Sequence, residues 1–151
     1  MVTTPRLVSG FFFGAGLLLT AAGLVGIALG LFFAPWLYDQ LPPVLIDTAA
    51  VGGAATALGV LLLGLAAAHV AAGLGLVRGV AMVHTPAVVL CLAMAALSVA
   101  WAVAALVSAA AGTGIPAAML PASIALGLVA AAYAWVARRL ISLPRSPSAT
   151  D

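Results

Sequence analysis

Glutamate and lysine are absent from this chain of 151 residues, and its only acidic side chains are those of Asp39, Asp47 and Asp151. A pair of carboxylates for general acid–base catalysis would have to be Asp39 with Asp47. We interpret both residues structurally instead, with Asp47 as a helix cap. Ser98 and Ser108 lack a recognisable nucleophile motif. The sequence therefore predicts that the protein is not an enzyme.

Charge of either sign is scarce. Only 5% of the residues are charged and 66% are hydrophobic, which gives a mean hydropathy of +1.35. A water-soluble domain cannot hide so much apolar surface in its core. The composition therefore predicts a membrane protein. The net charge of +2 reflects five arginines that we assign to membrane topology, so it indicates no nucleic-acid partner.

The apolar residues form three runs without charge, which are Leu7 to Tyr38, Thr48 to Val77 and Gly79 to Ala137. About 20 apolar residues are enough for one helix to cross a bilayer. The first two runs fit one span each, whereas AGTGIP (111–116) and Pro121 divide the third into two. We therefore predict four membrane-spanning helices, at about 7–33, 50–77, 86–110 and 120–140.

The arginines predict the orientation of these helices, because short cytoplasmic segments collect positive charge. All five fall at helix ends on one side of the predicted membrane; they are Arg6, Arg78, Arg138, Arg139 and Arg145. We predict an all-α integral membrane four-helix bundle that runs up-down-up-down, with both termini cytoplasmic. This domain covers residues 1–141, and the Ser- and Pro-rich residues 142–151 form a disordered cytoplasmic tail.

Pairs of small residues predict how the helices pack. Small residues four apart let two backbones approach closely, which matters in lipid because hydrophobicity no longer drives helices together. The first predicted helix has Gly10 with Gly14 and Gly26 with Gly30. The second predicted helix has further pairs, which are Ala55 with Gly59, Gly64 with Ala68 and Ala71 with Gly75. We expect these two helices to pack tightly.

The third predicted helix has a different pattern, a spacing of seven. Residues at this spacing lie on one strip of a helix surface. Two adjoining sets show it, namely His84, Cys91 and Ser98, and Met94, Trp101 and Ser108. We expect the face that carries both sets to look into the bundle.

The two histidines are the best candidates for chemistry. His84, Cys91 and Met94 include soft ligands that copper accepts, and His69 with His84 could bind a haem iron. His69 precedes Arg78 by nine residues, which places it roughly 13 Å into the bilayer, whereas His84 lies near the surface. We therefore predict no metal and no cofactor, with His84 at the interface. His69 is expected to face the bundle as an uncharged ring that hydrogen-bonds a hydroxyl or a carbonyl.

One segment carries a resemblance to known proteins. The sequence ALGVLLLGLAAAHVAAGLGLVRGVAMVHTPAVVL (57–90) is an Ala-, Leu- and Gly-rich helix that closes on GLGLVRG and leads into another helix. It resembles the second-to-third helix junction of small four-helix integral membrane proteins of unknown function from high-GC bacteria. The resemblance implies a bacterial inner membrane protein that is an accessory or uncharacterised component, with no catalytic residues.

Several functions are compatible with such a chain. We predict a non-catalytic accessory or scaffolding subunit that packs against itself or against a larger membrane complex. An alternative is a small transport or permeation unit, and a third hypothesis is a haem- or metal-binding electron-transfer subunit. Transport needs polar groups along a path, and the candidates are few: Thr20, Thr56, His69, Ser98 and Ser108. The expected partners are the lipid bilayer and either a membrane protein or further copies of this chain.

The arginine distribution makes a topological prediction. A cysteine placed at Gln40 will react with a labelling reagent supplied from outside the cell, whereas one placed at Ser146 will react only from the cytoplasm. Labelling of the two sites in the reverse pattern would show that the orientation is wrong.

Overall fold

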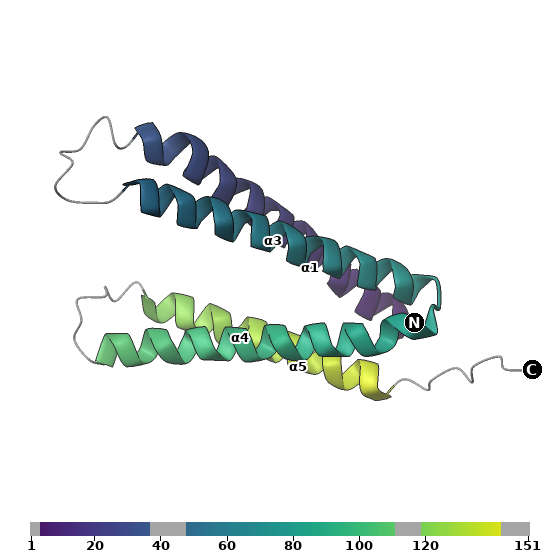
Figure 1. The fold of residues 1–151 in the computed structure, drawn as a ribbon. Coiled ribbons are helices and arrows are strands. Elements are labelled where there is room, and N and C mark those ends of the chain that lie inside the picture. Colours follow the sequence, from purple (N-terminus) through teal and green to yellow (C-terminus); the bar gives the residue numbers. More distant parts are fainter. Residues whose placement is uncertain (1–3, 37–47, 111–118, 143–151) are drawn as a thin grey trace, which may run out of the picture. The chain divides into compact units, whose positions relative to one another are not determined.

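The computed structural model describes residues 4–36, 48–110 and 119–142, which are helical except for the turn at residues 78–80. The first helix, α1 (Thr4–Ala28), continues into a π-helical turn, η1 (Leu29–Phe33). The other three long helices are α3 (Thr48–Val77), α4 (His84–Ala110) and α5 (Met119–Ser142), and a short 3-10 turn, η2 (Ala81–Val83), precedes α4 (Figure 1). The four predicted helices are thus confirmed, each within a few residues of its expected bounds.

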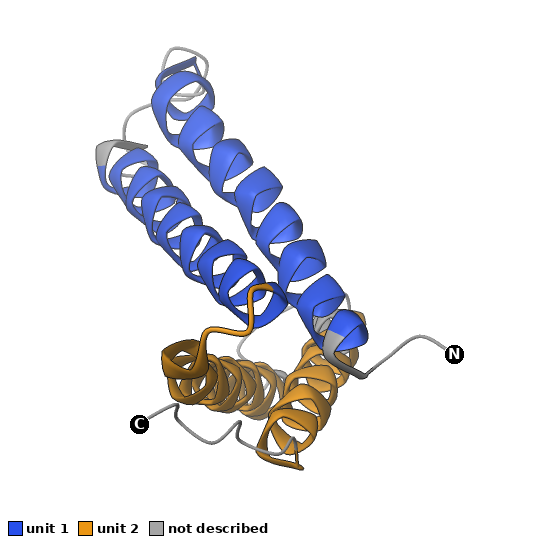
Figure 2. Ribbon diagram, turned by 90° about the vertical axis from the view of Figure 1, so that its right-hand side faces the viewer, with its two compact units in different colours: residues 1–77 blue, residues 78–151 orange. Residues whose placement is uncertain are grey.

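The chain divides into two compact units, residues 1–77 and 78–151 (Figure 2). Unit 1 is a hairpin in which α1 packs along α3, and unit 2 is a hairpin in which α4 packs along α5 (Figure 1). Asp39, Asp47, the segment 111–116 and the tail 143–151 lie outside the described residues. Pro121 falls in the first turn of α5, where its missing N–H leaves no hydrogen bond unmade.

All four long helices are long and apolar enough to cross a membrane. Between 17% and 28% of the residues in the most apolar part of each helix are buried inside the structure. Most of their leucine, valine and phenylalanine side chains therefore lie on the outside of the hairpins. Such surfaces are stable only in an apolar surrounding, since roughly 25 cal/mol is lost for each Å² of apolar surface left in water.

The contact between α1 and α3 is made by small residues that repeat every seven positions. All are buried; on α1 they are Ser9, Gly16, Gly23 and Gly30, and on α3 they are Gly52, Gly59, Ala66 and Gly73. Seven residues are close to two helical turns, so each set forms one strip along its helix. The expected tight packing of the first two helices is confirmed.

Two backbones touch along these strips. A Cβ added at Gly59 would lie 2.6 Å from the carbonyl oxygen of Gly23, and one added at Gly52 would lie 3.0 Å from that of Gly30. Contacts this short leave no room for a side chain on either helix. As residue numbers fall along α1 they rise along α3, so the two helices are antiparallel.

Only some of the glycines that are four residues apart contribute to the contact between α1 and α3. Gly26 belongs to the contact, because a Cβ added there would lie 3.1 Å from the Cα of Gly59. Nothing lies within 4 Å of a Cβ added at Gly10, Gly14 or Gly64. Those three residues are exposed, as is Ala68, whereas Gly75 is buried. The physical reason is that a spacing of four recurs on every side of a helix, whereas the repeat of seven follows the single strip that faces the partner.

The π-helical turn lies where α1 meets Thr56 of α3. Within Leu29–Phe33 the chain makes a wider turn, and the N–H of Ala34 donates to a carbonyl five residues back. Such a turn adds one residue to the helix. A side chain at Gly30 would collide with the Thr56 hydroxyl, so the close approach at this turn requires glycine.

In unit 2 the contact between α4 and α5 uses larger side chains. The buried residues are Ala87, Cys91, Ser98 and Ala102 on α4, and Ser123, Ala130, Tyr133, Val136, Ala137 and Leu140 on α5. The expected inward strip of α4 is therefore present at Cys91 and Ser98. The adjoining strip of Met94, Trp101 and Ser108 does not face inward along its whole length, because the Trp101 side chain is 63% exposed. Trp101 lies beside the strip that Ala87, Cys91, Ser98 and Ala102 define.

Two matched substitutions on α3 test the backbone contact. Gly59→Ala will destabilise the protein by about 1–3 kcal/mol, because its Cβ would meet the Gly23 carbonyl oxygen and the Ile27 backbone N–H, which cannot rotate away. Gly64→Ala makes the same chemical change at an open site and will leave stability equal or higher. Thermal unfolding in detergent measures both; equal effects would contradict the contact.

Candidate functional site

His69 is fully buried at the contact between α1 and α3. Its ring lies 5.8 Å from the ring of Phe12, measured between centroids, and its Cβ lies 3.5 Å from a Cβ added at Gly16. Nδ1 is 2.7 Å from the carbonyl oxygen of Leu65, one turn earlier in α3. Because a carbonyl can only accept, Nδ1 carries a proton and donates it. The predicted hydrogen bond of His69 to a carbonyl is therefore confirmed, and its partner belongs to its own helix.

Three hydroxyl groups of unit 1 donate to carbonyls in the same way. Thr20 donates to the carbonyl of Gly16 at 2.8 Å, and Thr56 donates to that of Gly52 at 2.9 Å. Near the start of α1, Ser9 donates to the carbonyl of Arg6 at 3.1 Å. Each side chain thus uses a carbonyl within one turn of its own helix, which is a common solution for hydroxyls in apolar surroundings.

His84 joins the two helices of unit 2. It is the first residue of α4, and its Nε2 lies 2.7 Å from the carbonyl oxygen of Leu140, near the end of α5. That carbonyl is one of the last four of α5, which lack an N–H partner within the helix. The imidazole therefore donates to a helix end that would otherwise need water. The structure places His84 half-exposed at the end of both helices of its hairpin.

This helix begins at His84, two residues before the predicted start at residue 86. The 3-10 turn Ala81–Val83 leads directly into α4, and His84 already has helical backbone angles. Thr85 therefore lies inside the first turn and does not cap the helix. Gly79, with φ of +69°, supplies the left-handed residue that turns the chain after α3.

Two of the residues considered as metal ligands, His84 and Cys91, lie one heptad apart on α4. Among the described residues no group of three or more His, Cys, Asp or Glu side chains could hold a metal ion. Cys91 is a buried free thiol in α4, one heptad beyond His84, and the Nε2 of His84 is already bonded to Leu140. His69 belongs to unit 1 and His84 to unit 2.

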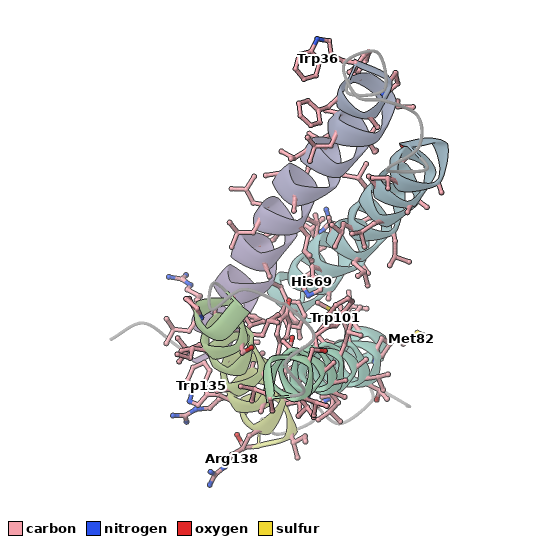
Figure 3. The ribbon with its side chains drawn as sticks, turned by 90° about the vertical axis from the view of Figure 1, so that its left-hand side faces the viewer. Trp36, His69, Met82, Trp101, Trp135 and Arg138 are labelled. Atoms are coloured by element: carbon pink, nitrogen blue, oxygen red, sulfur yellow. The ribbon has the colours of Figure 1, made fainter. Side chains whose placement is uncertain are left out.

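Aromatic and cationic side chains mark the helix ends. Beyond α1, the ring of Phe33 in η1 lies 5.4 Å from the ring of Trp36, and Trp36 is exposed and projects outward (Figure 3). In α5 the guanidinium carbon of Arg139 lies 5.3 Å from the centre of the Trp135 ring. Arg138 projects outward beside them (Figure 3). Tryptophan at such positions is typical of membrane–water interfaces.

Comparison of the chain with protein-family models, with curated proteins and with solved structures finds no match.

The pairs of small residues four apart do not reveal the main contact of unit 1, which is made by small residues that repeat every seven positions. Its signal is present in the sequence, since Gly16, Gly23 and Gly30 are seven apart and are matched by Gly52 and Gly59. The bond from His84 to Leu140 has no such signal, because it depends on the register between α4 and α5.

Substitution of His69 tests whether it is a packing residue. His69→Leu keeps an apolar side chain against Phe12 and removes the hydrogen bond to Leu65, and such a bond contributes about 0.6 kcal/mol in membranes, so the protein will insert and fold with a small loss of stability. Binding of any partner will survive. Unfolding in detergent and co-purification measure the two effects. Loss of partner or chromophore binding in a folded His69→Leu protein would identify His69 as a functional site.

Proposed function

We propose that this chain is a non-catalytic integral membrane protein that serves as an accessory or scaffolding subunit, packing against further copies of itself or against a larger membrane complex. The observation that carries the proposal is the open face of α1. Gly10 and Gly14 are exposed with nothing within 4 Å of an added Cβ, on the side of α1 away from the strip that contacts α3. Small residues one turn apart let another helix approach at backbone distance.

The polar side chains favour this role over transport. Thr20 and Thr56 each donate their hydroxyl hydrogen to a carbonyl of their own helix. A path for ions or polar solutes needs side chains that present hydrogen-bonding groups to the solute. Groups whose hydrogen bonds are directed back to their own backbone are better suited to packing in lipid.

The proposed setting is the inner membrane of a bacterium, with both termini in the cytoplasm. Within unit 2, the bond from His84 to Leu140 brings the start of α4 and the end of α5 together. Arg78, Arg138 and Arg139 therefore belong to the same end of this hairpin, as the positive-inside rule requires of a cytoplasmic end. The resemblance of residues 57–90 to small bacterial membrane proteins also supports this setting.

Native mass spectrometry after gentle purification tests the proposal. The full-length protein is expected to retain a stoichiometric membrane-protein partner or to form a defined homo-oligomer. The double variant Gly10→Leu with Gly14→Leu will lose that assembly, because leucine holds the approaching helix away from the backbone of α1.

The matched control is Gly53→Leu, which adds the same side chain at another open position of unit 1. It is expected to keep both the fold and the assembly. A lone monomer in the unmodified protein would contradict the accessory role and favour the transport alternative. An assembly that persists in the double variant would exclude the face of Gly10 and Gly14 as its interface.

A further inference from the structure

One side of α5 carries both of its arginines. Trp135, Arg138, Arg139 and Ser142 are three or four residues apart and all are exposed, so they share a face of the helix. The buried residues of the same segment are Tyr133, Val136, Ala137 and Leu140, which alternate with them and face α4. The face of α5 that carries Arg138 and Arg139 therefore points away from α4.

The guanidinium of Arg139 is held over an exposed indole. The separation of 5.3 Å from the ring centre is within the range of a cation–π interaction, and Trp135 is 47% exposed. Side chains on a helix lean toward its N-terminus, so Arg139 extends back along the apolar span. The planar cation is thus fixed at the depth that tryptophan occupies in a membrane interface.

No carboxylate of the neighbouring sequence balances this charge. Between Asp47 and Asp151 the chain contains no aspartate or glutamate, whereas it contains Arg78, Arg138, Arg139 and Arg145. The helices α4 and α5 therefore supply cations without acidic side chains. An anion from outside these helices would satisfy the exposed guanidinium groups.

The same face continues as an apolar strip. On the side of α5 that carries Trp135 and the arginines, Leu128 is 68% exposed and Ile124 is 66% exposed. A ligand that fits this surface has an anionic group at one end and a hydrocarbon chain extending along the helix. An acidic protein segment would complement the charge of the arginines, but it would not account for the exposed apolar strip beside them.

We propose that Arg138 and Arg139, with Trp135, bind the phosphate of an anionic phospholipid headgroup, whose acyl chain lies along Leu128 and Ile124. A guanidinium can donate two parallel hydrogen bonds to a phosphate, which an ammonium cannot. Stacking on Trp135 holds Arg139 in one orientation before the lipid binds, which lowers the entropic cost of binding. This site concerns lipid selection and goes beyond the accessory role.

Native mass spectrometry of the full-length protein in a neutral detergent measures the binding directly. Phosphatidylglycerol is expected to bind more tightly than phosphatidylcholine with the same acyl chains. Arg139→Gln will weaken phosphatidylglycerol binding about fivefold, the effect of one basic residue at an anionic surface. Arg139→Lys keeps the charge without the planar fork and will give an intermediate affinity.

Arg6→Gln is the matched control, because it removes one positive charge from an exposed residue of unit 1. It is expected to leave phosphatidylglycerol binding unchanged. Equal weakening by Arg6→Gln and Arg139→Gln, or equal affinity for the two lipids, would overturn the proposal. Displacement of the lipid by inorganic phosphate at an equal concentration would assign the site to free phosphate. An acidic protein lost on Arg139→Gln, with lipid binding unchanged, would assign it to a protein partner.

Discussion

The contact of two helix backbones at glycine is the interaction on which unit 1 depends. Helices covered with leucine and valine gain little by packing against each other when their surroundings are equally apolar, so close van der Waals contact must replace the hydrophobic effect. The backbones of α1 and α3 supply it where Gly23 meets Gly59 and Gly30 meets Gly52. Each added methyl group on this strip would separate the helices along a length of several turns.

The apolar surroundings also determine which hydrogen bonds the polar side chains of the hairpins make. A hydrogen-bond donor without a partner costs several kcal/mol in hydrocarbon. The same cost requires the backbone to be helical there. Thr56 and His69 meet this constraint inside α3, by donating to carbonyls one turn away. His84 meets it by capping the end of α5, which also fixes the register of unit 2 at one end. Arg138 and Arg139, near the same end of α5, are exposed.

The sequence predicts the elements of this fold better than their contacts. The apolar runs predict all four helices because length and lack of charge are properties of each segment alone. The glycine pairs predict that α1 and α3 approach closely, yet Gly10 and Gly14 have the same spacing as Gly26 and Gly30 and lie on the open face. The partner of His84 could not be predicted, since it depends on how α4 and α5 are aligned.

The register of the glycine contact can be observed without altering the protein. Solid-state NMR of the glycine-labelled protein in lipid bilayers reports carbon pairs within a few ångströms of each other. The backbone contact between α1 and α3 predicts cross-peaks from Gly59 to Gly23 and Gly26, and from Gly52 to Gly30, with none linking Gly64 to a glycine of α1. Cross-peaks from Gly64 to Gly10 or Gly14, with none from Gly59, would show that α1 and α3 pack through the other face and would contradict the account.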